Sequence, residues 1–498
     1  MVTYRIFPPI GIARLGEDAN FFIGPEIPGG GPGELQPDGT LGPVTQFKDA
    51  TRTKIRKQGA RFHLFESDDG LAWRPANLPA PATVTWTVTM ENKKSAVRRA
   101  GDPPIAPTRP QVVADLQSMV IQGGTRQVSG PNATSAVFHG PFATTAPNGQ
   151  PFNVDVELGQ LRTDAQGRLI VLGGKGFSSA PPNTPIGGPG GTTYYRNPKW
   201  HDDVADGPVT AEILLTPTST PIQVEGGAWV IVAPPDYAPG IDGVVTLYDV
   251  IYQLGIDHFG LPQPGTPSFD LGIAPLLTRV RRLRWVHDDA AWSDPIFDNP
   301  KLRSRALADK PLRETARNVV ERVEDVLQGH TNPQGPSFRL RSFQRKMLDD
   351  WVAGTFDDTP AQPDTSLTAA GLTHAALESA VGQGFCPGIE AGIIVLDTTL
   401  YRQPFDFRLD HTSVAAGDLT ALMAQPWQAD FLKCNTEWWP TQRPDLAPQS
   451  AGAPKDWIRG AASHRLLVER SGRLGFIVQQ GTTEVFLEVE RDSNLSQV

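Results

Sequence analysis

One short stretch, residues 428–444, brings a carboxylate, a thiol and two indoles within a few helical turns of one another. It reads QADFLKCNTEWWPTQRP and contains one of the two cysteines of the 498-residue chain. If the stretch is helical, Asp430, Cys434 and Trp438 lie on one face, with neighbouring Cβ atoms about 5–6 Å apart. Pro440 disfavours helical geometry in the residue before it and should end the helix there. A carboxylate in this position can accept a proton from the thiol or from a group that the thiol attacks.

Each of these residues also has a purely structural interpretation. Asp430 can be a satisfied polar group on a helix face, and Cys434 can be a small buried hydrophobe, because free cysteines are among the most buried residues. Trp438 and Trp439 precede the sequence Pro-Thr-Gln-Arg-Pro, and such indoles often pack in a corner against a guanidinium. We prefer that interpretation for Trp439. The other cysteine, Cys386, lies in a turn-rich Gly-Phe-Cys-Pro-Gly loop.

Motifs spread over nearly the whole chain resemble those of one protein family. They are IGIARLG (10–16), FFIGPE (21–26), WHDDVADGPV (200–209), PPDYAP (234–239), FCPGIE (385–390) and PWQAD (426–430). In these segments the chain resembles the LodA-like family, the group of lysine ε-oxidases and glycine oxidases. The cofactor of that family is cysteine tryptophylquinone, which is made from a cysteine and a tryptophan of the protein itself.

The resemblance implies roles for individual residues. An aspartate at the position of Asp430 assists cofactor formation and is the candidate catalytic base, and Cys434 matches the cross-linked thiol. The tryptophan of the family precedes a Leu-Gly-Phe segment, and here Ser471 stands at that position. A serine cannot become a quinone. Three alternatives remain: one of the other indoles after Cys434, which are Trp438, Trp439 and Trp457, is the partner; the tryptophan of the family corresponds to another position; or the protein makes no such cofactor.

The resemblance also implies an activity and partners. It predicts an oxidoreductase that deaminates a primary amine of an amino acid with O₂, giving hydrogen peroxide and ammonia. Cys386 would border the substrate entrance, a flavoprotein would help to build the quinone, and several copies of the chain would assemble. Two alternatives remain open: a LodA-like enzyme without a quinone that does other chemistry in the same pocket, and a protein that only binds an amino-acid-like ligand.

A cluster of three aspartates beside His201 suggests a metal site, because hard cations take several oxygen ligands. The spacing of Asp202, Asp203 and Asp206 matches no known calcium loop. We therefore interpret these carboxylates as acceptors of backbone N–H groups in a loop that precedes the strand 209–215. Zinc and serine-hydrolase motifs are absent from the sequence, and its glycine-rich runs lack the spacing of nucleotide-binding loops.

Composition narrows the class of protein. The net charge of −9 argues against nucleic-acid binding. No apolar run approaches the roughly 18 residues that a membrane-spanning helix needs, and the N-terminus shows no basic segment followed by an apolar core. We therefore expect a globular, cytoplasmic protein.

Hydrophobic patterning predicts an α+β fold with a β-rich N-terminal domain (1–270) and a mixed C-terminal domain (271–498) that carries the Asp430/Cys434 site. Strict alternation or continuous apolar runs predict strands, and spacing of three and four residues predicts helices. The strands are expected at 83–90, 152–158, 229–233, 392–396 and 484–490, and the helices at 315–328, 342–352 and 372–381. Residues 463–468 fit either a short helix capped by Ser463 or a strand.

Overall fold

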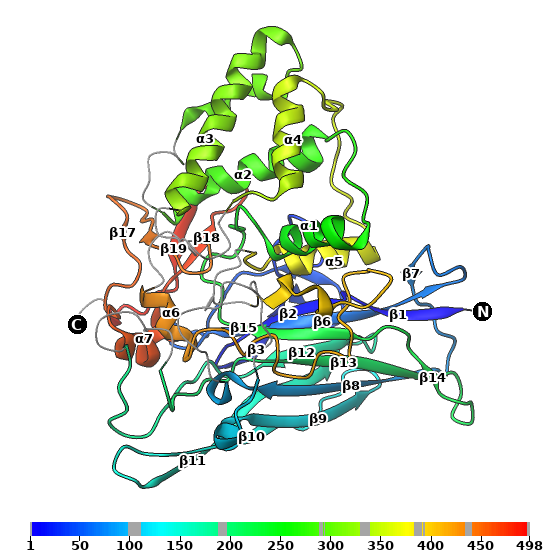
Figure 1. Cartoon of the computed structure of the whole chain (residues 1–498), viewed down its shortest axis with the longest axis vertical. Coiled ribbons are helices and arrows are strands. Elements are labelled where there is room, and N and C mark those ends of the chain that lie inside the picture. The colour runs from blue at the N-terminus through cyan, green and yellow to red at the C-terminus, as the bar shows by residue number, and fades with distance from the viewer. Residues whose placement is uncertain are drawn as a thin grey trace.

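The computed structural model describes residues 2–97, 111–187, 197–287, 292, 294–328, 339–382, 391, 394–433 and 441–495, without the side chains of 323–328, 430, 432 and 433. The fold is α+β, as the sequence predicts. In Figure 1 the strands fill the lower half of the molecule, α1 and α5 lie above them, and α2, α3 and α4 form the top.

A 15-stranded sheet forms the larger part of the structure. Its strands are β1 (Thr3–Phe7), β2 (Ile10–Arg14), β3 (Asp18–Ile23), β4 (Gly33–Leu35), β5 (Leu41–Pro43), β6 (Arg56–Ser67), β7 (Arg74–Pro75), β8 (Thr83–Asn92), β9 (Ile121–Ser129), β10 (Phe138–Thr145), β11 (Pro151–Thr163), β12 (Leu169–Gly173), β13 (Ala205–Leu214), β14 (Ile222–Gln223) and β15 (Ala228–Ala233). The main path runs β10-β11-β12-β6-β2-β15-β13-β8-β9. Along this path β2 and β15 pair in parallel, with Ile10 opposite Trp229, so both strands end at the same edge of the sheet.

The burial of side chains explains why the predicted strands form. All six residues of β15 are buried, as expected for a continuous apolar run in the middle of a sheet. In β8, buried residues alternate with more exposed ones from Trp86 to Asn92, because successive side chains point to opposite faces. The strands predicted at 83–90, 152–158 and 229–233 are confirmed.

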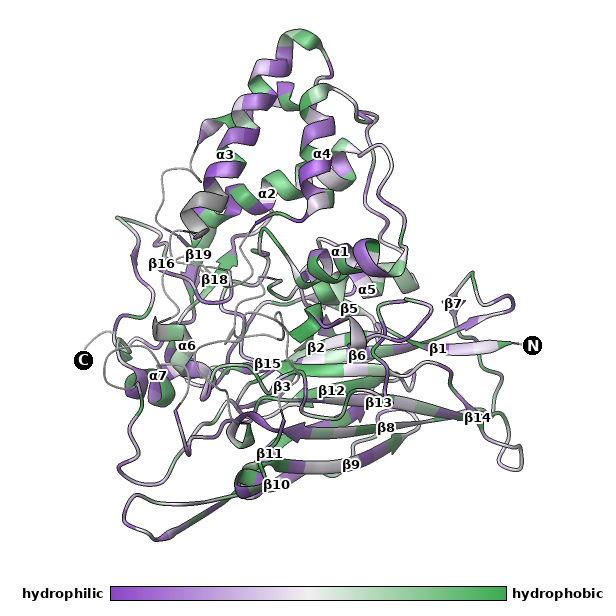
Figure 2. Cartoon of the chain, viewed as in Figure 1, coloured by the Kyte–Doolittle hydropathy of each residue, from purple (hydrophilic) through white to green (hydrophobic). Residues whose placement is uncertain are grey.

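Seven α-helices are described. They are α1 (Leu247–Phe259), α2 (Ala274–Arg282), α3 (Lys310–Gln328), α4 (Ser342–Ala353), α5 (Ala369–Glu378), α6 (Trp427–Lys433) and α7 (His464–Arg470). The three predicted helices are confirmed as α3, α4 and α5. Figure 2 shows hydrophobic and hydrophilic residues side by side on α3 and α4, which is typical of amphipathic helices. No described helix is both long and apolar enough to cross a membrane.

Local signals fix the ends of the helices. The Thr246 hydroxyl and the Asp249 carboxylate form a capping box at the start of α1, and Gly260 ends that helix in the left-handed region at φ 73°. The Ser463 hydroxyl accepts a hydrogen bond from Leu466 N. The element that the sequence leaves open is therefore the helix α7.

The C-terminal part contains two small hairpins, β16 (Leu446–Ala447) with β17 (Lys455–Asp456) and β18 (Phe476–Gln479) with β19 (Phe486–Val489). The strand predicted near the C-terminus is confirmed as β19. The strand predicted at 392–396 is wrong in its described part, because Ile394–Leu396 form a 3₁₀ turn. A short buried apolar run cannot be assigned to strand or helix from its pattern alone.

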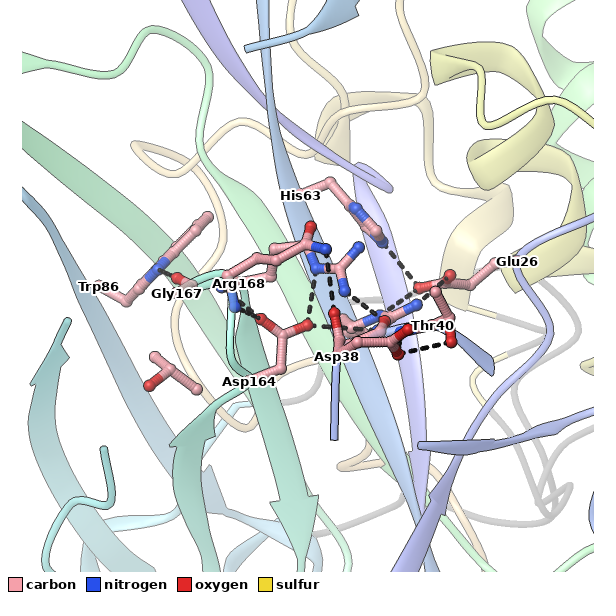
Figure 3. A network of polar contacts seen from close by, with 12 residues as sticks. Glu26, Asp38, Thr40, His63, Trp86, Asp164, Gly167 and Arg168 are labelled. Atoms are coloured by element: carbon pink, nitrogen blue, oxygen red, sulfur yellow. Dashed lines mark hydrogen bonds and ion pairs between the residues drawn. The ribbon is translucent and has the colours of Figure 1, made fainter. Parts of the chain in front are cut away.

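A buried network of charges ties β6 to two loops (Figure 3). The Arg61 guanidinium donates to both Glu26 oxygens, at 2.7 and 2.6 Å, and to Asp164 at 3.2 Å. Arg168 Nε donates to the same Asp164 at 2.6 Å. Burial opposes ionisation of Glu26, but hydrogen bonds from Arg61 and the nearby His63 outweigh it and lower the pKa of Glu26 to about 2. The pairing offsets the cost of burying these charges.

We predict that Glu26→Gln lowers the free energy of unfolding at pH 7 by about 3 kcal/mol, because Arg61 loses a buried counter-charge. Folding lowers the pKa of this carboxyl from 4.5 to about 2, so the ionised group stabilises the folded protein. This contribution to stability is complete at neutral pH and is lost as the pH falls from about 4.5 towards about 2. Denaturant unfolding between pH 7 and 3 measures both effects. The matched control is Glu34→Gln, whose side chain is 34% exposed beside Arg56 and should cost less than about 1 kcal/mol. Equal losses for the two variants would contradict the prediction.

Candidate functional site

A cavity of about 300 Å³ lies where several strands of the sheet end. Its walls come from the segments that follow β2, β12 and β15, from the segment before β6, and from α6, α7 and the turn that begins at Ser471. Because β2 and β15 are parallel neighbours, the loops that follow them meet at one edge. This edge is where sheets that contain parallel strands commonly bind ligands.

Gly16 shapes one wall of this cavity. A Cβ atom at this position would lie 2.7 Å from the backbone atoms of residues 55–57, which is closer than real Cβ contacts allow. The absence of a side chain therefore lets the loop after β2 lie directly against the start of β6. This requirement gives a physical reason for the last glycine of the IGIARLG motif.

Charged side chains of both signs line the cavity. Lys54 Nζ lies 3.5 Å from a carboxylate oxygen of Glu17, and Lys175 Nζ lies 2.8 Å from Glu157. The hydrogen bond to Glu157 raises the pKa of Lys175, which is therefore protonated at neutral pH. Glu469 and Arg473 contribute a further anion and cation to the lining. A cavity with both kinds of charge suits a zwitterion such as an amino acid.

Asp202 fastens the helix α6 beside this cavity. Its Oδ2 atom accepts a hydrogen bond from the backbone N–H of Trp427, the first residue of α6, at 2.8 Å. The same oxygen lies 2.5 Å from Lys94 Nζ, and Oδ1 accepts from Asn92 at 3.1 Å. Asp202 and Lys94 are 1% and 2% exposed. The carboxylate thus satisfies an amide at the helix N-terminus while a buried ammonium neutralises it.

Asp203 holds the loop that follows β12. Its Oδ2 atom accepts from Gly176 N at 2.7 Å and from Phe177 N at 3.2 Å, and both residues line the cavity. A Cβ atom on Gly174 would lie 2.5 Å from this oxygen. Burial, with the charge of Asp202 as a smaller cause, raises the pKa of Asp203 to about 7.

Asp206 connects the sheet to residues 419 and 420. Its oxygens accept from Thr420 N at 2.9 Å, from Thr420 Oγ1 at 2.7 Å and from Trp229 Nε1 at 2.9 Å. Burial raises the pKa of this carboxyl to about 6. The expected role of the aspartate cluster as acceptors of backbone N–H groups is confirmed, although Asp206 lies inside β13 rather than in a loop. Among the described residues, no group of three potential ligands could hold a metal ion.

Of the predicted catalytic residues, Asp430 lies within α6 and Cys434 directly follows that helix in the chain. The backbone of Asp430 is part of this helix, and its side chain is not described. Cys386, Cys434 and Trp438 lie outside the described residues. The structure therefore provides the helix that leads to Cys434 and the cavity beside that helix.

Trp457 and Ser471 have contrasting surroundings. Trp457 is fully buried, its Nε1 donates to the Gly475 carbonyl at 2.8 Å, and its ring centroid lies 4.8 Å from that of Tyr237. An amine could not reach this enclosed ring without displacing its neighbours. Ser471 lines the cavity and is 7% exposed. Neither of these two residues fits a tryptophylquinone that faces the cavity.

Two residues that the sequence did not single out also contribute to the site. Trp427 lines the cavity, and its buried Nε1 has no hydrogen-bond partner among the described residues. Gln428 accepts from Ser178 Oγ at 2.7 Å and donates to the Gly176 carbonyl at 3.2 Å. Both lie in the PWQAD motif and connect α6 to the cavity wall, so position within a recognised motif was the signal that could have identified them.

We predict that Asp203→Asn removes a pH dependence of stability. The raised pKa means that the folded protein favours the protonated carboxyl, so this stabilisation is complete below about pH 4 and is lost as the pH rises through about 7. Asparagine can still accept from Gly176 and Phe177. Denaturant unfolding measures the free energy of unfolding of both proteins. The value for the variant, relative to that for the natural protein, should rise by at least about 2 kcal/mol from pH 4 to pH 8. Asp68→Asn, at a side chain 66% exposed, is the control. The prediction would be refuted if the variant and the natural protein differed in unfolding free energy by the same amount at pH 4 and at pH 8.

Comparison with known proteins identifies relatives over most of the chain. The L-lysine ε-oxidase N-terminal model matches residues 7–232, and the L-lysine ε-oxidase C-terminal domain model matches residues 328–457. The L-lysine 6-oxidase of Marinomonas mediterranea is 27% identical over 539 aligned residues, which cover 88% of this chain and 72% of that protein.

Solved structures of the L-lysine ε-oxidase from Marinomonas mediterranea share the fold. The structure of its Schiff base intermediate with L-Lys aligns with a TM-score of 0.78 at 23% identity, and a further structure of this enzyme aligns with the same score at 22% identity. Each alignment covers 98% of this chain and 95% of the solved chain. With the two domain matches and the shared motifs, this chain belongs to the LodA-like family of amino-acid oxidases.

Proposed function

We propose that this protein binds an amino acid in the cavity beside Ser471 and oxidises its primary amine with O₂, releasing ammonia and hydrogen peroxide. The observation that carries the proposal is the cavity itself, where cationic and anionic side chains lie beside the first turn of α6. An amino acid brings a carboxylate and an ammonium, so it can pair with both kinds of side chain. Family membership supports the reaction class.

The reaction sets requirements that the residues must meet. Oxidation of the amine removes one proton from carbon, one proton from nitrogen and two electrons, and it leaves an imine. Water converts the imine to ammonia and an aldehyde or keto acid, while O₂ takes up two electrons and two protons to give hydrogen peroxide. We assign Asp430 as the base that takes the proton from carbon. Cys434 with Trp438 is the pair proposed to form the tryptophylquinone of the family, which would supply the electron sink.

A second candidate function is favoured by the two residues that do not fit a quinone. Ser471 cannot supply an indole, and Trp457 is enclosed in the core. A LodA-like protein without a quinone would keep the charged cavity and bind an amino-acid-like ligand, with different chemistry or with none. The two functions differ in whether Cys434 is covalently modified.

Peptide masses of protein purified from its native host distinguish these candidates. The host matters because the family resemblance implies a flavoprotein that helps to build the cofactor. If the oxidase proposal holds, a peptide containing Cys434 should be linked to a tryptophan peptide, with two oxygens added and four hydrogens lost. The linked tryptophan should be Trp438, so Trp457 serves as an internal control that stays unmodified. An unmodified Cys434 in that material would exclude the quinone and support the second candidate.

We predict that Asp430→Asn lowers the rate of peroxide release by at least about 100-fold, because a general base typically contributes 10²–10⁴ to a rate. The assay measures hydrogen peroxide and ammonia with L-lysine, glycine and other amino acids as substrates. Asp349→Asn is the control, since this side chain on α4 is 58% exposed and pairs with Arg317. Equal activity of the two variants would reject Asp430 as the base. Absence of peroxide with every amino acid would reject the oxidase function.

A further inference from the structure

A second cavity, of about 440 Å³, lies far from Ser471 along the strand β6. Ile55, just before β6, lines the first cavity, whereas His63 and Leu64 line the second. From Ile55 to His63 the chain extends about 26 Å, at about 3.3 Å per residue. The two cavities share no lining residue, so the second is a separate site.

His63 is the polar group that characterises this cavity. It is 3% exposed, and its Nε2 atom lies 2.7 Å from Oε1 of Glu26, as Figure 3 shows. Glu26 is ionised at neutral pH and can only accept hydrogen bonds, so Nε2 of His63 must carry the hydrogen. Burial lowers the pKa of His63 against the attraction of Glu26, which keeps the imidazole neutral. Its Nδ1 atom therefore bears a lone pair.

This lone pair has no partner within the described structure. The hydrogen bond to Glu26 involves Nε2, and no described group donates to Nδ1. Although His63 is almost entirely buried, it contributes to the wall of the cavity. An acceptor without a donor in the protein can accept a hydrogen bond from whatever occupies the cavity. A ligand in the cavity can provide that donor.

The rest of the lining is mixed, with apolar side chains beside the polar side chains of Asn77, Thr83 and Gln166. Trp86 donates its Nε1 hydrogen to the Gly167 carbonyl at 2.9 Å, so it offers the cavity an apolar ring. Arg168 Nε is bonded to Asp164, and its Nη2 donates to the Gly39 carbonyl at 2.5 Å. Leu64, Val84 and Leu367 belong to the apolar part of the lining.

The charges around the cavity are balanced within the protein. Two guanidinium groups, Arg61 and Arg168, face the two carboxylates of Glu26 and Asp164. An ionic ligand would add a charge for which this network holds no counter-ion. An uncharged ligand leaves the balance intact.

We propose that this cavity binds a small uncharged hydroxyl compound of the phenol class. Its hydroxyl group donates to Nδ1 of His63, and its ring packs against Trp86, Leu64 and Val84. The proposal does not depend on the oxidase function, because it rests on different residues at the other end of β6.

Isothermal titration calorimetry with phenol and with toluene tests the hydrogen bond directly in the full-length protein. The two probes have the same shape, but only phenol has a donor. We expect one phenol per chain and about fivefold weaker binding of toluene, which is the usual effect of one neutral hydrogen bond. Equal affinities for the two probes, or no heat from phenol at millimolar concentration, would overturn the proposal.

Two variants locate the bound phenol. Val84→Trp fills the cavity and should weaken phenol binding at least tenfold, whereas Val485→Trp, at a position 39% exposed outside this site, should leave it unchanged. His63→Phe keeps a ring but removes the acceptor, so phenol and toluene should then bind equally. Circular dichroism verifies that each variant is folded. If His63→Phe does not fold, the comparison of Val84→Trp with its control Val485→Trp still tests whether phenol binds in this cavity. Phenol affinity unchanged by Val84→Trp would reject the site.

Discussion

The arrangement of this molecule depends on a buried carboxylate, Asp202, that joins the sheet to the helix beside the candidate site. An ionised group without water is tolerated only when opposite charges and hydrogen bonds surround it. Lys94 supplies the charge and the Trp427 amide supplies a hydrogen bond, so the three groups stabilise one another. Asp203 and Asp206, which follow closely in the chain, hold the loop after β12 and residues 419–420 by accepting hydrogen bonds from their backbone amides. One short acidic motif thus fixes three distant segments around the sheet.

The cavity beside Ser471 is a consequence of this arrangement. The sheet contributes the ends of two parallel strands, and Asp202 and Asp203 set α6 and the loop at 176 against them. The charged lining suits an amino acid, in agreement with the family to which the chain belongs. Ser471, which lines the cavity, cannot supply an indole. The chemistry therefore depends on whether Cys434 finds another indole, and Trp457 is too enclosed to serve.

The sequence predicted local structure well and long-range contacts poorly, for physical reasons. Alternation in 83–90 and continuous burial in 229–233 are local properties, so the corresponding strands were predictable. The run at 392–396 was assigned wrongly because burial alone does not distinguish a strand from a 3₁₀ turn. The role of the three aspartates as hydrogen-bond acceptors was also predictable, but not their partners, since Lys94 lies 108 residues from Asp202. The same applies to His63 and Glu26, which meet only because β6 lies against the loop after β3.

The most direct test of this account is amide hydrogen exchange of the peptide that contains Trp427, compared between the natural protein and Asp202→Asn. Exchange should be at least about tenfold faster in the variant, because the amide at the start of α6 loses a charged acceptor, worth about 1.4 kcal/mol or more. Peptides from β10 and β11, which do not contact Asp202, should exchange at the same rate in both proteins. Unchanged exchange at Trp427 in a folded variant would contradict the claim that Asp202 holds α6 in place.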